Sequence, residues 1–439
     1  MKVLKFGGTS VGSAQRMKEV AKLITDGERK IVVLSAMSGT TNTLVEISDY
    51  LYKKNPEGAN EIINKLESKY RQHIDELFAT PEYKQKGLEL IKSHFDYIRS
   101  YTKDLFTLFE EKVVLAQGEL ISTAMMNYYL QECGVKSVLL PALEYMRTDK
   151  NAEPDPVYIK DKLQVQLELH PDAEIYITQG YICRNAYGEI DNLQRGGSDY
   201  TASLIGAAIN ASEIQIWTDI DGMHNNDPRI VDKTAPVRHL HFEEAAELAY
   251  FGAKILHPTC IQPAKYANIP VRLLNTMDPT APGTLISNDT EKGKIKAVAA
   301  KDNITAIKIK SSRMLLAHGF LRKVFEIFES YQTSIDMICT SEVGVSVSVD
   351  NTKHLNEILD DLKKYGTVTV DKDMCIICVV GDLEWENVGF EAKALDAMRD
   401  IPVRMISFGG SNYNISFLIR ECDKKVALQS LSDMLFNGK

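Results

Sequence analysis

Short apolar runs alternate with segments of helical spacing through the first two thirds of the chain. An apolar run between turn residues predicts a buried strand, and apolar residues recurring every three or four positions predict a helix. The predicted strands cover residues 3–6, 30–37, 137–141, 174–180, 213–219 and 269–275. Helices are predicted at 14–24 and along 44–132, with breaks near Asn55-Pro56 and Thr80-Pro81 and a last helix starting at Gln117. Strands that alternate with helices favour an α/β fold, a mainly parallel sheet between helices.

The pattern changes after a turn-rich segment at 278–284 and a polar segment at 291–294. We place a domain boundary between residues 292 and 293. Beyond it, the order strand, helix, strand, strand occurs twice. Predicted strands cover 304–309, 334–338, 343–349, 375–380, 403–407 and 413–419, and predicted helices cover 320–328, 389–399 and the C-terminal segment. This repeat predicts two small ferredoxin-like α+β units.

Composition limits the class of protein. The chain has 439 residues, of which 44% are hydrophobic and 25% charged, as in soluble globular proteins of two or three domains. Its net charge of −9 argues against binding to nucleic acid or to an anionic membrane surface. Its seven cysteines are scattered, and the pair Cys375 and Cys378 falls inside an apolar strand, so we expect reduced thiols, no metal site and a cytoplasmic protein.

Candidate chemistry begins where the first predicted strand ends. Lys5 ends the strand, Gly7 and Gly8 follow, and Ser10 precedes the first helix. Glycines let backbone N–H groups approach a ligand, and a helix N-terminus favours an anion such as phosphate. The alternative is an ordinary turn with a solvated lysine. Ligands of parallel sheets bind beyond the carboxyl ends of the strands, where Ser35 and Thr218 also lie.

A second glycine pair opens a predicted helix at residues 195–199. Gly196 and Gly197 again precede a helix start, Arg195 suits a carboxylate, and Asp199 would lie in the first turn. The alternative for Asp199 is a carboxylate that merely suits the helix dipole.

Two further stretches add charge near strand ends. Thr218 and Asp219 end a strand, Arg229 could meet a phosphate, and Lys254 follows a glycine. Phosphate-cradling loops with lysines and arginines are typical of phosphoryl transfer, which needs positioning, charge neutralisation and usually Mg²⁺. A carboxylate nucleophile would need no general base.

Taken together, five motifs resemble the aspartate kinase family, and most of all its lysine-sensitive monofunctional bacterial form. They lie at residues 5–10, 118–119, 195–200, 217–219 and 251–258. The resemblance implies an amino-acid-kinase domain over 1–292, followed by two interleaved ACT domains in 293–439. One ACT domain would cover about 311–373, and the other 295–310 plus 374–439, so that the strand near 304–309 joins the later one.

The resemblance also implies the reaction. ATP with Mg²⁺ would phosphorylate L-aspartate to 4-phospho-L-aspartate, the first step towards lysine, threonine and methionine. Lys5 would stabilise the transferring phosphoryl group, and Asp199 would orient the lysine and the loop. The implied aspartate-binding residues are Ser35, Thr41, Glu119, Arg195, Gly196, Gly197 and Ser198. The implied nucleotide-binding residues are Lys5, Gly7, Gly8, Ser10, Thr218, Asp219, His224, Arg229 and Lys254, with His224 in place of the family's usual tyrosine.

A regulatory site is implied in the C-terminal part. The residues matching the family's lysine pocket are Met314, Ser334, Asp336, Thr340 and Glu342, while Ala317 replaces an expected serine. The alternative is that Asp336 and Glu342 are solvated loop carboxylates. ACT domains pair across a two-fold axis, so we expect at least a homodimer.

Two other functions stay open. The chain could be a kinase for another amino-acid carboxylate, although Glu119 and Arg195 together suit an α-amino acid. It could instead be an amino-acid sensor with an inactive kinase domain, against which the intact Lys5, Asp199 and Lys254 argue.

Overall fold

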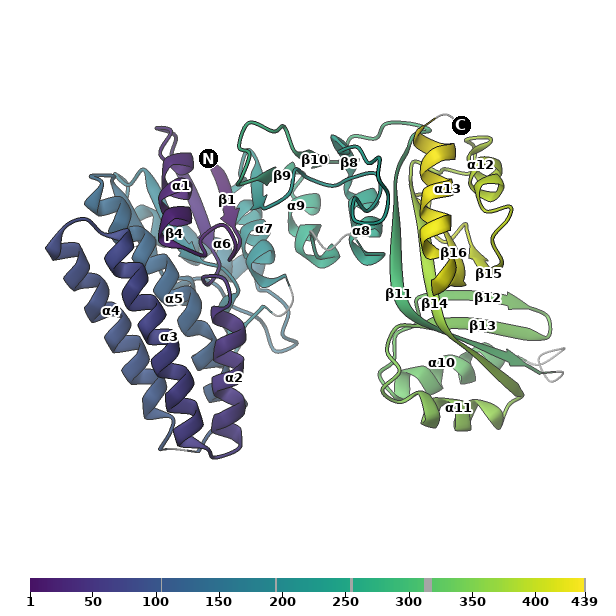
Figure 1. Ribbon diagram of the computed structural model, residues 1–439, viewed down its shortest axis with the longest axis horizontal. Coiled ribbons are helices and arrows are strands. Elements are labelled where there is room, and N and C mark those ends of the chain that lie inside the picture. The colour runs from purple at the N-terminus through teal and green to yellow at the C-terminus, as the bar shows by residue number, and fades with distance from the viewer. Residues whose placement is uncertain (104, 194–195, 253–255, 312–317, 438–439) are drawn as a thin grey trace. The chain divides into compact units, whose positions relative to one another are not determined.

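The computed structural model describes residues 1–103, 105–193, 196–252, 256–311 and 318–437 (Figure 1). The chain forms two compact units. The first contains residues 1–223 and 255–288, and the second contains residues 224–254 and 289–439. The segment 224–254 therefore groups with the C-terminal part, although it precedes the predicted boundary at 292/293.

The first unit is built on a mainly parallel sheet. Within this unit its order is β3 (Ser137–Leu140), β4 (Ile175–Gln179), β2 (Lys30–Leu34), β1 (Lys2–Phe6), β7 (Ile214–Thr218), β9 (Val271–Asn275) and β10 (Thr284–Ser287). Among the pairs that these seven strands form in the described residues, only β9–β10 is antiparallel. The carboxyl ends of β1, β2, β4 and β7 therefore meet at one edge, as the alternating pattern predicted.

One face of this sheet is covered by helices α1 (Ala14–Ile24), α2 (Thr40–Tyr52), α3 (Pro56–Leu77), α4 (Pro81–Ser100) and α5 (Leu108–Glu132). Figure 1 shows α3, α4 and α5 as long helices lying side by side. The predicted breaks are confirmed, since α3 and α4 begin at Pro56 and Pro81. None of the helices in the described residues has the length and apolarity of a membrane span.

Helix α5 begins earlier than predicted. It starts at Leu108 rather than Gln117, because the Thr107 side chain and the Glu110 carboxylate form a capping box there. As a result, Glu119 lies in the middle of a helix whose residues around it are largely buried.

The opposite face of the sheet carries α7 (Gly197–Ile209), which packs on β1, β2 and β7. Helices α6 (Pro156–Glu168) and α9 (Gln262–Tyr266) pack against α7. The hairpin β5 (Ile182–Arg184)–β6 (Ile190–Asn192) precedes α7 in the chain. Neither α6 nor this hairpin was predicted from the sequence.

The second unit begins with β8 (His239–His241) and α8 (Phe242–Tyr250) and continues into an antiparallel sheet. The order of that sheet is β12 (Met337–Ser341), β13 (Gly344–Val349), β11 (Ile295–Lys310), β14 (Thr367–Gly381), β16 (Asn414–Arg420) and β15 (Val403–Ser407). In Figure 1, β11 and β14 run as the two longest strands of this unit.

The long strands β11 and β14 serve two cores. Ile307 packs with helices α10 (Phe320–Ser330) and α11 (Leu355–Lys363), whereas Val298 packs with α12 (Phe390–Ala397) and α13 (Lys424–Phe436). This corrects the assignment of residues 304–309 to the later ACT unit. The β11–β14 register shifts between Lys301 and Ile304, so the two halves of one strand belong to different cores.

Candidate active site

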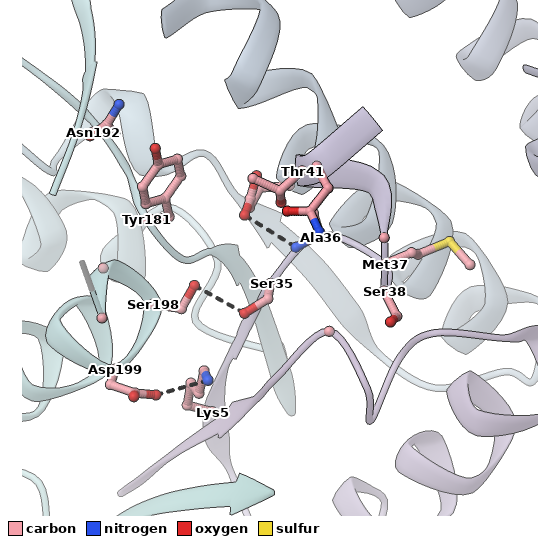
Figure 2. Close-up of a pocket in the computed structure, with 16 residues that line it drawn as sticks. Lys5, Ser35, Ala36, Met37, Ser38, Thr41, Tyr181, Asn192, Ser198 and Asp199 are labelled. Atoms are coloured by element: carbon pink, nitrogen blue, oxygen red, sulfur yellow. Dashed lines mark hydrogen bonds and ion pairs between the residues drawn. The ribbon is translucent and has the colours of Figure 1, made fainter. Parts of the chain in front are cut away.

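A cleft of about 720 Å³ opens at the carboxyl edge of the parallel sheet in the first unit (Figure 2). Its walls come from the loops after β1 and β2, the first turns of α2 and α7, and the middle of α5. The structure brings together nine of the residues predicted for catalysis or for binding substrate or nucleotide: Lys5, Gly8, Ser35, Thr41, Glu119, Gly196, Gly197, Ser198 and Asp199.

Strand alternation aims Lys5 at α7. Its neighbours Leu4 and Phe6 lie in the core beneath the α1–α5 helices, so Lys5 points to the other face of the sheet. There its Nζ lies 2.8 Å from Asp199 Oδ1, and the two side chains are 11% and 12% exposed. Asp199 is in the first turn of α7, where the helix dipole favours its negative charge. The ion pair, drawn in Figure 2, fixes an ammonium group inside the cleft.

The turn before α7 requires a glycine. Gly196 has a φ of +69°, and a Cβ placed there would lie 2.5 Å from Cys260 Sγ and 2.9 Å from His257 Cβ. The Cys260 thiol also donates a hydrogen bond to the Gly196 carbonyl at 3.3 Å. This packing sets where α7 begins, and hence where Asp199 lies.

The loops after β1 and β2 pack closely against each other. A Cβ on Gly8 would lie 2.8 Å from the Ala36 carbonyl oxygen, and Ser38 N donates to the Gly8 carbonyl at 3.1 Å. The Ser35 hydroxyl donates to the Ser198 hydroxyl at 3.0 Å (Figure 2). Because of these contacts, the two glycine turns predicted to converge form one rim.

Two helix N-termini open into this rim. Helix α2 begins after Gly39 and α7 after Gly196, and neither start carries a side-chain cap. Uncapped first-turn N–H groups, together with the helix dipoles, favour an anion. Thr41 is exposed in the first turn of α2 and lines the cleft.

Glu119 contributes a buried carboxylate. It is 4% exposed, and its Oε1 accepts a hydrogen bond from Ala36 N at 3.2 Å. Within the described residues its Oε2 has no hydrogen-bond partner. Burial raises the pKa of Glu119 to about 7. A buried carboxylate oxygen that lines a cleft without a donor suits a ligand ammonium group.

Some cleft residues were missed by the sequence analysis. Tyr181, Asn192, Ser38 and Asn42 line the cleft, and Ser122 holds its wall by donating to the Ser35 carbonyl at 2.8 Å. Tyr181 has the unusual φ of +70°. None of these residues lies in a recognisable motif. The β5–β6 hairpin positions Tyr181 and Asn192, helix α5 positions Ser122, and the loop after β2 and the start of α2 position Ser38 and Asn42.

The residues predicted to bind the nucleotide lie in different surroundings. Ser10 is fully buried and its hydroxyl bonds to Thr276 Oγ1 at 2.8 Å, so its observed role is structural, contrary to the prediction. Gly7 lies next to Lys5 Nζ. Thr218 ends β7 beside β1, with Asp219 exposed after it, but neither lines the cleft.

His224 and Arg229 belong to the second unit. There Arg229 forms two bonds to Asp227, at 2.9 and 2.7 Å, and His224 Nδ1 lies 3.0 Å from Thr234 Oγ1. Arg195, Lys254 and Met314 lie outside the described residues.

The predicted effector residues lie along β12 in the second unit. The Asp336 side chain is 1% exposed, and its Oδ1 accepts from Lys301 Nζ at 2.7 Å and from the Tyr250 hydroxyl at 2.8 Å. Asp336 is therefore not a solvated loop carboxylate. Ser334, Thr340 and Glu342 are exposed. Asp336 and Glu342 flank opposite ends of β12, roughly 20 Å apart at the rise of a strand.

Comparison with known proteins identifies the family. Residues 1–275 match the amino acid kinase family, and residues 377–435 match the ACT domain. The chain is 35% identical to aspartokinase 1, chloroplastic, of Arabidopsis thaliana over 459 residues, which cover 99% of this chain and 80% of the relative. It is 32% identical to lysine-sensitive aspartokinase 3 of Escherichia coli over 447 residues, 99% of each protein.

The fold comparison gives the same family. The crystal structure of E. coli aspartokinase III in complex with aspartate and ADP matches with a TM-score of 0.85 and 31% identity, over 99% of this chain and 100% of the other. The predicted fold class and family resemblance are thus confirmed. The chain belongs to the aspartokinases, within the amino acid kinase family, and carries a C-terminal ACT domain.

Proposed function

We propose that this protein transfers the γ-phosphoryl group of ATP to the side-chain carboxylate of L-aspartate, giving 4-phospho-L-aspartate and ADP. The observation that carries the proposal is that one cleft holds both the Lys5–Asp199 pair and the unpartnered oxygen of Glu119. Family membership and the similarity to a structure with aspartate and ADP support it. The same family places the reaction at the start of lysine, threonine and methionine biosynthesis.

The proposed role of each residue follows from its charge or its hydrogen-bonding groups. Lys5 would stabilise the charge that develops on the transferring phosphoryl group, and Asp199 would hold the lysine in position. Glu119 would bind the α-ammonium of aspartate. Arg195, Ser198 and the helix N-termini would bind carboxylate or phosphate oxygens. The attacking carboxylate is already ionised at neutral pH, so no general base is needed.

Mg²⁺ fits this site as part of the nucleotide complex. In phosphoryl transfer the ion is held by substrate phosphates and one or two carboxylates, rather than by a cage of protein ligands. Asp199 lines the cleft and could supply such a carboxylate. The ion would neutralise phosphate charge during transfer.

The function is tested by measuring ADP release with L-aspartate, with L-glutamate and without an amino acid, while hydroxylamine traps the acyl phosphate. We expect ADP release and a trapped hydroxamate with aspartate alone. Turnover with glutamate but not aspartate would support a kinase for another carboxylate. Amino-acid binding without any turnover would support an inactive sensor.

The pH dependence of kcat/KM for aspartate should follow the ionisation of Glu119. The free enzyme must lose the Glu119 proton to accept an ammonium, and burial raises its pKa to about 7. With saturating MgATP, kcat/KM for aspartate should fall about tenfold per pH unit below about pH 7. The bound ammonium should lower that pKa, so kcat should stay nearly level over the same range. A kcat/KM that is constant between about pH 8 and about pH 6 would contradict this role.

We further propose that the C-terminal unit binds an inhibitory amino acid, lysine by analogy with the lysine-sensitive relative, and that it pairs chains into a homodimer. Asp336 supports this, because its buried Oδ2 has no hydrogen-bond partner within the described residues and could accept an ammonium. Burial raises the pKa of Asp336, while the Lys301 and Tyr250 hydrogen bonds favour its ionised form.

Replacing Asp336 with alanine should weaken inhibition by lysine at least about tenfold, because a buried charged hydrogen bond is lost. Maximal activity without lysine should stay within about twofold, because Asp336 lies in the second unit and the catalytic cleft in the first. The matched control is Asp350→Ala, which removes the other, 42% exposed carboxylate bound to Lys301. Inhibition curves that coincide for Asp336→Ala and the wild type would remove Asp336 from the effector site.

A further inference from the structure

Tyr181 adopts a backbone conformation that side chains avoid. Its φ of +70° lies in the left-handed region, which is strained for a residue with a Cβ. Two hydrogen bonds hold it there: Tyr181 N donates to Thr201 Oγ1 at 3.0 Å, and its carbonyl accepts from Leu193 N at 2.8 Å. Strain that the surrounding structure maintains is concentrated at functional sites.

The strained turn places the Tyr181 ring at the wall of the cleft. A Cβ on Gly197 would lie 2.6 Å from Tyr181 Cδ2, so the ring rests against the start of α7. Figure 2 shows the ring beside Ser198, on the side of the pocket that also carries Asn192. No hydrogen bond joins its hydroxyl to any residue of the described ranges.

The hydroxyl is a neutral donor at physiological pH. Burial, followed by the nearby charge of Glu119, raises the pKa of Tyr181 to about 12. Tyr181 and Glu119 both line the cleft. A strained tyrosine with an unused donor thus lines the same cleft as the carboxylate proposed to bind the substrate ammonium.

We propose that Tyr181 contributes to substrate binding by donating a hydrogen bond from its hydroxyl to the α-carboxylate of the amino acid. This inference rests on the proposed function. If the side-chain carboxylate of aspartate meets Lys5 and its α-ammonium meets Glu119, the α-carboxylate is attached to the same carbon as the ammonium and must lie near Glu119. Tyr181 presents a donor in the same cleft, and the two hydrogen bonds of its backbone hold the turn that carries the ring.

Tyr181→Phe tests this, because it removes one oxygen and leaves the ring and the turn in place. We expect KM for aspartate to rise about tenfold, the usual effect of losing a hydrogen bond to a charged group, with kcat within about twofold. Succinate lacks the ammonium but keeps both carboxylates, so its inhibition constant as a competitor of aspartate should rise by the same factor.

Tyr187→Phe is the matched control, since this tyrosine is 77% exposed in the turn of the same hairpin, and its kinetics should match the wild type. An unchanged KM in Tyr181→Phe would overturn the proposal. So would a rise in KM for aspartate without weaker succinate inhibition, because the hydroxyl would then contact the ammonium. A wild-type protein that fails to phosphorylate aspartate would instead refute the proposed function itself.

Discussion

Replacing Lys5 with alanine is expected to lower kcat about a thousandfold or more while leaving the fold intact. Within the described part of the cleft, the Lys5 ammonium forms an ion pair with Asp199 at 2.8 Å. Both side chains are largely shielded from water. Groups placed in advance where charge develops are worth about a hundredfold to a thousandfold each in kcat. The loss should exceed the upper end of this range, because Asp199 would be left as an unpaired negative charge beside the phosphates.

The measurement is kcat for aspartate phosphorylation at saturating ATP, with circular dichroism to check the fold. Lys2→Ala is the matched control, because Lys2 lies on the same strand, is 38% exposed and pairs with Glu28 at the surface. Its kcat should equal that of the wild type. Near-normal kcat in Lys5→Ala would remove Lys5 from the reaction and, with it, the proposed mechanism.

Replacing Glu119 with glutamine is expected to raise KM for aspartate about a hundredfold with a much smaller change in kcat. The variant keeps the shape and the contact with Ala36, but it removes the charge that would pair with the substrate ammonium. Truncating one partner of a buried, hydrogen-bonded charge pair costs about 2–5 kcal/mol of binding.

The stability of Glu119→Gln should not fall, although its aspartate binding weakens. This distinguishes the loss of binding from misfolding. Burial raises the pKa of Glu119 to about 7 in the folded protein, above its ordinary value of 4.5. The folded state therefore holds this proton more tightly, and the contribution of Glu119 to stability falls as the pH rises from about 4.5 to about 7. At about pH 8, Glu119→Gln should have a melting temperature equal to or above the wild type.

The matched control is Glu111→Gln on the same helix, whose carboxylate bonds to the Tyr52 hydroxyl at 2.7 Å. Its KM for aspartate should not change. If Glu119→Gln bound aspartate as well as the wild type does, the ammonium would have to be recognised elsewhere in the cleft.

Local patterns predicted the parts of the fold that depend on neighbours in the chain. Pro56 and Pro81 mark helix starts because proline fits only the first turn, and β1, β2 and β7 are apolar runs bounded by polar turns. The start of α5 was mispredicted, because the capping box at Thr107 and Glu110 precedes the apolar spacing used to find the helix. Each of these outcomes follows from a few consecutive residues.

Side-chain partners could not be predicted in the same way. Ser10 follows the glycine turn as a phosphate ligand would, yet it packs into the core against Thr276. One reading of the sequence made Asp336 a solvated loop carboxylate. In the structure it contacts Lys301, beside the register shift of β11, and Tyr250, at the end of α8. These contacts join segments that periodicity treats as independent.

The glycine turns, the alternation that turns Lys5 away from the helical bundle, and the family of the protein can all be recognised in the printed sequence. Three features depend instead on packing between distant segments: Glu119 is buried with one oxygen unpartnered, Tyr181 enters the cleft, and one long strand serves two cores. The reason is physical. Contacts such as Ala36–Glu119 and Ser35–Ser198 join residues 83 and 163 positions apart, and packing rather than local propensity brings them together.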